Sequence, residues 1–501
     1  MKYYSMSIRF ITFILFCFLL LISCQNKTTV GLNRPNILFV FADDQRADAL
    51  GLGENPNINT PALNALAQNG VRFDNCYVMG GHHGAICAPS RAMLMSGKNL
   101  FNVYDRLDRV LTLPQYLSQF GYRTFGTGKW HNGAASFEAT FQEGKNVFLG
   151  GMSDHFNVPC QDIQADGTLG EITYKQFSTD LFAEAANAFL KETHTQPFFC
   201  YIAFTAPHDP RSPATAYQAS LNDRTIPLPQ NFMPLHPFQF DDFNVRDETL
   251  APWPRTPELI QSSLAEYYAL IEHIDDRVAE LIETLKQTGA YDNTLIIYAA
   301  DNGLALGSHG LLGKQNLYEH STKVPLLLSG PGIPKNEVKE ALVYLYDLFP
   351  TLTDLLHIPL PDGIDEKSIL PIIKGEATDV RETLYTAYRN TVRAVRDKDW
   401  KLIRYPQIDY TQLYHLKNDP QEIENLATTP SHQARLEQMM DLLVLEHQKN
   451  KDTMNLNPPQ IQEKYYDYRL LNQTPDRHQP EYILEKYFYP FQNRDSNPGK
   501  N

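Results

Sequence analysis

Four apolar runs, rich in β-branched and aromatic residues, dominate the hydrophobic pattern of this chain. No charged residue interrupts any of them, which is typical of strands that are buried on both faces of a sheet. The pattern therefore predicts buried strands at Asn36–Ala42, Phe198–Thr205, Thr294–Ala300 and Pro325–Ser329.

Helical periodicity fills much of the sequence between these runs. Its clearest example is Pro257–Thr288, where apolar residues recur every three or four positions between cap signals at Thr256 and Gly289. Buried strands that alternate with helices predict an α/β layer fold with a largely parallel sheet. In such folds, chemistry gathers beyond the carboxyl ends of the strands.

The pattern changes after about residue 380. Beyond it, short strands are predicted at 391–396, 400–405 and 412–416, and an amphipathic helix at about 432–447. These elements are typical of a small α+β subdomain. We therefore expect two domains, at 35–380 and 381–501.

Two segments without clear periodicity also carry information. Residues 207–257 contain ten prolines, which predicts a long ordered loop region near the functional edge of the sheet. The tyrosine-rich stretch 464–490 is expected to pack back on the body, because so many aromatic side chains are unfavourable in water.

The first residues have the pattern of an export signal. Lys2 and Arg9 precede an apolar run, Ile11–Ile22, that is too short to span a bilayer. The run ends in Leu-Ile-Ser-Cys24, which looks like a bacterial lipobox. We expect residues 1–23 to be a lipoprotein signal peptide, Cys24 to be acylated and residues 24–34 to form a tether to the membrane. The alternative is an ordinary signal peptide that happens to contain a cysteine.

Charge narrows the classes of partner. Removing residues 1–23 takes away two positive charges and moves the net charge from −14 to −16. An acidic body argues against nucleic acid, and an anionic substrate would need a locally positive pocket. Four cysteines remain beyond Cys24, too few for a disulfide-built scaffold: Cys76, Cys87, Cys160 and Cys200.

Polar residues follow three of the predicted strands. Asp43 and Asp44 come after the first, His208 after the second, and Asp301 and Asn302 after the third. A single Asp-Asp pair after a strand is more often a turn or a cap. Two acidic strand ends in one sheet instead supply the carboxylate and amide oxygens that a hard divalent cation prefers.

Cys87-Ala88-Pro89-Ser90-Arg91 is the most informative motif. Proline favours the first turn of a helix, so Cys87 should lie at a helix start, where free N–H groups and the helix dipole favour an anion. The pentapeptide resembles the signature of the type I sulfatases, in which the cysteine is oxidised to formylglycine and the hydrated aldehyde is the nucleophile. An isolated cysteine in front of a helix would more often be a buried small thiol.

Further segments resemble this family in the order that it requires. They are Gly128-Lys129-Trp130-His131, Ala206-Pro207-His208 and Gly313-Lys314, followed by Leu317-Tyr318-Glu319. Residues 391–426 look like its C-terminal subdomain. The resemblance implies an alkaline phosphatase-like sandwich, with a large, largely parallel or mixed sheet between helices and a small α+β subdomain with a short antiparallel sheet.

The resemblance also implies the site. Ca²⁺ would be bound by two aspartates after the first strand, the modified cysteine and the Asp-Asn pair: Asp43, Asp44, Cys87, Asp301 and Asn302. Arg91 would hold the formylglycine, and Lys129 and Lys314 would bind the sulfate oxygens. His208 would protonate the leaving oxygen and His131 would take the proton that triggers elimination.

Two further interpretations concern residues outside these roles. Arg211 is a candidate contact for a second acidic group on the substrate. His82 and His83, just before the signature, could form a second metal pair, but substrate contacts or structural roles are the better interpretation of loop histidines.

These observations predict a lipid-anchored, Ca²⁺-dependent sulfatase that releases inorganic sulfate from a sulfated saccharide, such as an algal or host polysaccharide. A formylglycine-generating enzyme would be its maturation partner, and the cell envelope, periplasmic or on the outer membrane, its location. One alternative is a phosphonate or phosphate ester hydrolase of the same superfamily. Another is an inactive glycan-binding lipoprotein.

Overall fold

A computed structural model describes residues 34–52, 55–218, 226–241, 243–365, 367–471, 474–475, 479 and 481–489. The predicted signal peptide and Cys24 lie outside these residues. Among the described residues, no helix is both long and apolar enough to cross a membrane.

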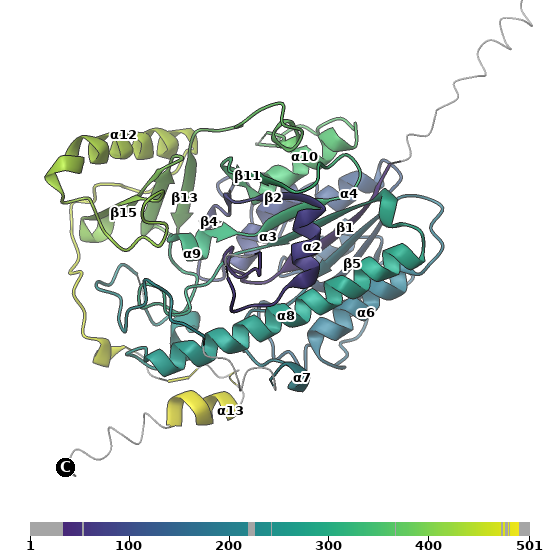
Figure 1. The fold of residues 1–501 in the computed structure, drawn as a ribbon, viewed down its shortest axis with the longest axis horizontal. Coiled ribbons are helices and arrows are strands. Elements are labelled where there is room, and N and C mark those ends of the chain that lie inside the picture. Colours follow the sequence, from purple (N-terminus) through teal and green to yellow (C-terminus); the bar gives the residue numbers. More distant parts are fainter. Residues whose placement is uncertain are drawn as a thin grey trace, which may run out of the picture. The chain divides into compact units, whose positions relative to one another are not determined.

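The centre of the fold is a mixed eight-stranded sheet (Figure 1). Five neighbouring strands of this sheet run parallel to one another: β8, β1, β7, β5 and β6. Strand β10 is antiparallel to both β8 and β2. The order across the sheet is β11 (Glu337–Lys339), β2 (Gly70–Phe73), β10 (Leu326–Ser329), β8 (Thr294–Ala300), β1 (Asn36–Ala42), β7 (Phe198–Ala203), β5 (Arg123–Lys129) and β6 (Glu143–Phe148).

The central position of β1 follows from its composition. Six of its seven residues are buried, and it pairs in parallel with β7 on one side and β8 on the other. Side chains without charge on either face allow helices to cover both faces of the sheet. The four apolar runs are therefore strands, as predicted, with the correction that the Pro325–Ser329 run begins at Leu326 and is antiparallel.

Helices form two groups around the sheet (Figure 1). Contacts join α2, α6, α7 and α8 in one group and α3, α4, α5, α10 and α11 in the other. The bounds of these helices and of the short helix α9 are α2 Pro61–Gln68, α3 Cys87–Ser96, α4 Leu113–Ser118, α5 Ala134–Thr140, α6 Ser178–Leu190, α7 Thr215–Gln218, α8 Pro257–Gln287, α9 Glu319–Thr322, α10 Leu348–Leu355 and α11 Leu370–Ile373.

The long helix α8 has the predicted bounds to within one residue. The Thr256 side chain accepts a hydrogen bond from the Leu259 N–H at its start, and Gly289 follows its end with a positive φ of 73°. Glycine is suited to that position because a side chain disfavours left-handed backbone.

The C-terminal part contains the predicted small sheet with two strands that were not predicted, β13 and β4. Its order is β16 (Tyr410–His415), β15 (Trp400–Tyr405), β14 (Val392–Arg396), β13 (Leu384–Tyr388) and β4 (Gly80–Gly81), and α12 (Gln433–Lys449) packs on it. Strands β13 to β16 are antiparallel, but β4 is parallel to β13. Because β4 lies just before Cys87, this sheet is joined directly to the segment that carries the signature.

The remaining short elements close the fold. A three-stranded sheet joins β12 (Val343–Tyr344), β3 (Cys76–Tyr77) and β9 (Lys323–Val324). In the tail, α13 (Glu481–Ile483) and the turn after it bury Ile483, Tyr487 and Phe488, whereas Tyr465 and Leu470 are mostly exposed. The tail therefore packs back on the body only in part.

An ion pair inside the C-terminal sheet leads to a prediction about stability. The Arg393 guanidinium donates to both oxygens of Asp452, and both side chains are almost fully buried. We expect Arg393→Gln to lower the free energy of unfolding by about 3–5 kcal/mol, because Asp452 keeps a buried charge without its partner. Thermal unfolding measures the loss. An unchanged midpoint would contradict it, and the activity of the folded fraction should be unaffected.

Candidate active site

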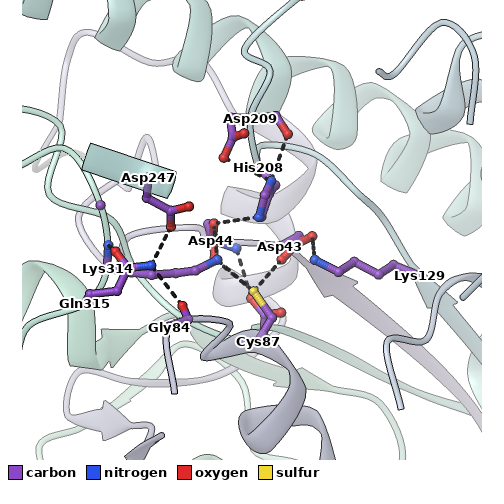
Figure 2. A network of polar contacts seen from close by, with 12 residues as sticks. Asp43, Asp44, Gly84, Cys87, Lys129, His208, Asp209, Asp247, Lys314 and Gln315 are labelled. Atoms are coloured by element: carbon purple, nitrogen blue, oxygen red, sulfur yellow. Dashed lines mark hydrogen bonds and ion pairs between the residues drawn. The ribbon is translucent and has the colours of Figure 1, made fainter. Parts of the chain in front are cut away.

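The site lies where the sheet strands end at their carboxyl edge (Figure 2). Asp43 and Asp44 follow β1, Asp301 follows β8, and Lys129 is the last residue of β5. The strand pattern therefore predicted the correct edge for the three aspartates, whereas Lys129 lies on a strand that it did not predict. Figure 2 shows Cys87 at the start of α3 directly below the two aspartates.

Cys87 occupies the first position of α3 and is 1% exposed. Its Sγ lies 3.2 Å from Asp43 Oδ1, 3.4 Å from Asp44 Oδ1 and 2.8 Å from Lys314 Nζ. Burial, together with the charges of Asp301 and the two other aspartates, holds the pKa of the Cys87 thiol well above its ordinary value. The unmodified side chain is therefore a neutral thiol and a poor nucleophile.

Asp44 has an unusual backbone. Its φ is +68°, its N–H donates to Asp301 Oδ1 at 2.9 Å, and its carbonyl accepts from the Tyr267 hydroxyl at 2.7 Å. Aspartate tolerates left-handed backbone better than branched residues do. These bonds from β8 and α8 fix the turn that points both carboxylates of the Asp43-Asp44 pair at Cys87.

Like charges and burial shift the pKa values of these carboxyl groups. Burial and then Asp301 raise the pKa of Asp43 to about 6, against the effects of Lys129 and Arg91. Burial raises the pKa of Asp44 to about 8, even though Lys314 acts to lower it. Burial also acts to raise the pKa of Asp301, but Arg91 and the two lysines hold it below its ordinary value.

Three buried cations face the three carboxylates. Lys129 Nζ contacts Asp43 Oδ2, and Lys314 Nζ lies 2.6 Å from each oxygen of Asp44. Arg91 Nε donates to Asp301 Oδ2 at 2.8 Å, and its Nη1 donates to the Lys129 carbonyl at 2.7 Å. The three basic side chains therefore balance the three carboxylates when all six groups are ionised.

His208 projects into the same cluster. Its Nδ1 lies 2.8 Å from the Asp209 carbonyl, which can only accept, so Nδ1 carries the proton and Nε2 faces Asp44 Oδ2 at 3.6 Å. Burial and then Lys314 lower the pKa of His208 well below its ordinary value. This orientation leaves Nε2 as the atom through which the ring exchanges a proton with the site.

Other predicted residues are less closely bound to the cluster. His131 has a positive φ of 69° and a buried Nδ1 with no hydrogen-bond partner among the described residues. Burial and then Lys129 lower its pKa well below the ordinary value. Arg211 is 8% exposed and acts electrostatically on Asp209, but no hydrogen bond joins it to the described cluster.

His82 and His83 have partners of their own. His82 Nε2 contacts the Leu100 carbonyl at 3.0 Å, and His83 Nε2 contacts the Asp105 carboxylate. In the described parts of the chain, neither belongs to a group of three or more metal-ligating side chains.

The donor set fits a divalent cation. Ligand atoms of Asp43, Asp44, Cys87 and His208 all lie within 4.8 Å of one another. Asn302 is 1% exposed and follows Asp301 at the same strand end, where its side-chain oxygen could join the carboxylates as a ligand. Carboxylate and amide oxygens at adjacent strand ends suit a hard cation such as Ca²⁺.

The sequence pattern did not reveal the buried residues that contact the neighbours of this cluster. Arg246, Asp247 and Glu248 lie in the proline-rich stretch, and Gln315 follows Lys314. Asp247 and Glu248 are buried, and Gln315 Nε2 donates to Asp247 Oδ2 at 2.8 Å. This stretch has no hydrophobic periodicity, so nothing in its sequence indicates that the side chains of Asp247 and Glu248 are buried.

Comparisons with known proteins show the family of this chain. The family profile described as sulfatase matches residues 35–358, and the one described as N-sulphoglucosamine sulphohydrolase, C-terminal, matches residues 307–450. An N-acetylglucosamine-6-O-sulfatase of Bacteroides thetaiotaomicron is 27% identical over 86% of this chain and 89% of its own length. A choline-sulfatase of Rhizobium meliloti is 29% identical over 79% of this chain and 83% of its own.

Solved structures have the same fold. A protein solved in complex with its substrate D-glucosamine-2-N,6-O-disulfate superimposes with a TM-score of 0.71 and 23% identity, over 84% of this chain and 99% of its own. A phosphonate monoester hydrolase from Silicibacter pomeroyi gives a TM-score of 0.64 and 23% identity, over 84% and 96%. The fold is thus alkaline phosphatase-like, as predicted.

The sulfatase profile covers well over half of the chain, and both acidic strand ends and the signature cysteine lie within it. The chain therefore belongs to the type I sulfatase family, and it is a sulfuric ester hydrolase.

Proposed function

We propose that this enzyme removes sulfate from a sulfated saccharide by means of a formylglycine at position 87 and a Ca²⁺ ion. The observation that carries the proposal is the contact of one side chain, Cys87, with Asp43, Asp44 and Lys314 at once. A nucleophile in this position has carboxylates on one side, where a cation can bind, and an ammonium group on the other.

Formylglycine and Ca²⁺ would each supply one part of the chemistry. A formylglycine, once hydrated, provides one hydroxyl to attack sulfur and a second hydroxyl whose deprotonation expels sulfate and restores the aldehyde. Ca²⁺ on Asp43, Asp44, Asp301 and Asn302 would attract the sulfate oxygens and favour ionisation of the attacking hydroxyl.

The chain's own residues bind the ester and move protons. Lys129 and Lys314 would bind the sulfate oxygens, and the positions of both ammonium groups beside Asp43 and Asp44, with Lys314 also against Cys87, support this role. Binding of the anionic ester would favour the doubly protonated ring of His208, which would then give a proton from Nε2 to the leaving oxygen while Nδ1 stays bonded to Asp209. His131 would accept the proton of the second hydroxyl, and its low pKa keeps the ring neutral for this task. Arg91 would fix residue 87 from the far side.

The saccharide part of the proposal is supported by relatives. The matched enzymes of Bacteroides thetaiotaomicron and Homo sapiens are both N-acetylglucosamine-6-sulfatases by name, the human one 29% identical over 80% of this chain. A 6-O-sulfated glucosamine unit is therefore the first substrate to test. The choline-sulfatase relative makes choline sulfate the necessary comparison.

We also propose that the enzyme is anchored in the bacterial cell envelope through Cys24 after maturation by a formylglycine-generating enzyme. The support is the lipobox-like Leu-Ile-Ser-Cys24 pattern and the signature at Cys87. Metabolic labelling with a fatty-acid analogue, compared between the native chain and Cys24→Ala, would test the anchor.

Conversion of Cys87 is the first prediction for the mechanism. Tryptic peptides of enzyme co-expressed with a formylglycine-generating enzyme should show the aldehyde mass at position 87. Cys87→Ala should reduce turnover to background because no nucleophile remains, while its thermal midpoint stays close to that of the native protein. Full activity from enzyme with an intact thiol would contradict the mechanism.

Calcium removal is the second prediction. Ca²⁺ at a hundredfold excess over its Kd should stabilise the folded enzyme by about 2.7 kcal/mol, and a chelator should abolish turnover. Asp301→Asn removes one buried negative charge and should lose most of the calcium-dependent rise in thermal midpoint. Asp275→Asn is the matched control, because that carboxylate accepts from the Ala62 and Leu63 N–H groups instead. Equal shifts in both variants would argue against the site.

The reaction class is the third prediction. Parallel assays with aryl sulfate and aryl phosphate esters should show a strong preference for sulfate, since the chain belongs to the sulfatase family. Among natural esters, N-acetylglucosamine 6-sulfate should be cleaved in preference to choline sulfate. A preference for phosphate would favour the phosphonate or phosphate ester hydrolase, and saccharide binding without any turnover would favour the glycan-binding lipoprotein.

A further inference from the structure

Three consecutive residues contact the segments that carry the active-site side chains. Arg246, Asp247 and Glu248 begin a short 3-10 helix, Arg246–Leu250, in the connection between β7 and α8. Asp247 is 4% exposed and Glu248 is 3% exposed. Buried carboxylates persist only where they are paired or hydrogen-bonded, so their partners indicate what they do. Each of the three side chains contacts a different wall of the site.

Arg246 holds the wall that carries His208. Its Nη1 donates to Asp209 Oδ2, and its Nη2 donates to Asp209 Oδ1 at 2.9 Å. The Asp209 carbonyl lies 2.8 Å from His208 Nδ1, and its Oδ1 lies 3.2 Å from the same atom. A bidentate arginine fixes the plane and position of a carboxylate. Arg246 therefore sets the direction in which His208 Nε2 points.

Glu248 holds the wall that carries Lys314. Its carboxylate accepts from the Leu312 N–H at 3.1 Å and from the Gly313 N–H at 2.8 Å. A methyl group added at Gly313 would lie 2.3 Å from Gln315 Oε1 and 2.8 Å from Asp247 Cβ. The backbone just before Lys314 is thus hydrogen-bonded to Glu248 and leaves no room for a side chain at Gly313.

Asp247 connects these walls to the nucleophile. Its Oδ1 accepts from Arg246 Nη2 at 2.8 Å, and its Oδ2 accepts from Gln315 Nε2 at 2.8 Å. Gln315 Nε2 also donates to the carbonyl of Gly84 at 2.9 Å, three residues before Cys87 (Figure 2). A continuous path of hydrogen bonds therefore runs from His208 through Asp247 to the loop in front of Cys87.

We propose that Arg246, Asp247 and Glu248 are positioning residues that hold His208 and Lys314 in register with residue 87. This inference rests on the proposed roles of His208 as proton donor and Lys314 as sulfate ligand. A proton donor works only within hydrogen-bond reach of the leaving oxygen. None of the three side chains needs to touch the substrate, because each acts through a residue that does.

The dependence of rate on the leaving group tests this inference. The experiment measures kcat of the native enzyme, His208→Ala and Arg246→Gln for a series of substituted phenyl sulfates, whose phenols range from strongly to weakly acidic. The slope of log kcat against the pKa of the leaving phenol is then compared between the variants. An acidic phenol leaves without protonation, whereas a weakly acidic phenol needs the proton of His208. We expect Arg246→Gln to lose about 10²-fold in kcat for the poorest leaving group and less than about threefold for the best, in the same sense as His208→Ala.

Matched variants separate positioning from stability. Arg246→Lys keeps the positive charge but cannot make the bidentate contact with Asp209. Its slope should therefore lie between those of the native enzyme and Arg246→Gln. Glu248→Gln should raise KM by a similar factor for every phenyl sulfate, because Lys314 binds sulfate regardless of the leaving group. Arg393→Gln removes an arginine–carboxylate pair in another part of the chain, where the arginine side chain is 1% exposed against 28% for Arg246, and should lower the thermal midpoint without changing the slope.

The outcomes distinguish the two levels of the proposal. If His208→Ala steepens the slope and folded Arg246→Gln and Arg246→Lys keep the native slope, the positioning role is overturned and the proposed function stands. If the native enzyme hydrolyses no sulfate ester after maturation, the proposed function fails and the inference fails with it. A steeper slope in the Arg246 variants, with an unchanged slope in Arg393→Gln, supports positioning.

Discussion

The structure depends on one electrostatic constraint, which is the burial of several full charges at the carboxyl edge of the sheet. Removing a charge from water costs several kcal/mol, and only close, well-oriented opposite charges offset that cost. The fold meets the constraint by drawing these charges from several different elements, so that each carboxylate has a basic side chain beside it. The charges are Asp43, Asp44 and Asp301 against Arg91, Lys129 and Lys314.

Parallel strand pairing is what makes this convergence possible. Strands β1, β7 and β8 are in register, so the residues that follow them emerge at one level of the sheet. The signature helix α3 reaches that level from another direction because β4 ties Gly80 and Gly81 to β13. At Gly80 the φ is 105°, and a Cβ there would lie 2.0 Å from the Ala387 carbonyl oxygen. Glycine is therefore required where the C-terminal sheet joins the nucleophile segment.

The amino-acid sequence was sufficient for those parts of the site that have a local signal. Uninterrupted apolar runs indicate buried strands, so the pattern alone predicted that the aspartates after β1 and β8 share one edge of the sheet. Arg246 and Glu248 could not be found in this way, because their partners, Asp209 and Gly313, are defined only by tertiary contact. The two-residue strand β4 was missed for a related reason, since two glycines carry no hydrophobic period. The antiparallel direction of β10 also has no signal in its composition.

Charge balance explains why this cluster suits a cation and an anionic ester together. The three carboxylates and three basic side chains cancel when all are ionised, so a bound sulfate monoester alone would leave one buried negative charge. Burial raises the pKa of Asp43 to about 6 and that of Asp44 to about 8, so these carboxyl groups lose their protons less readily than they would in water. A divalent cation, as proposed, would reverse the sign of the balance and favour the ionised form of both carboxyl groups. The same field keeps a thiol at Cys87 neutral, so chemistry at this position requires a nucleophile other than a thiolate.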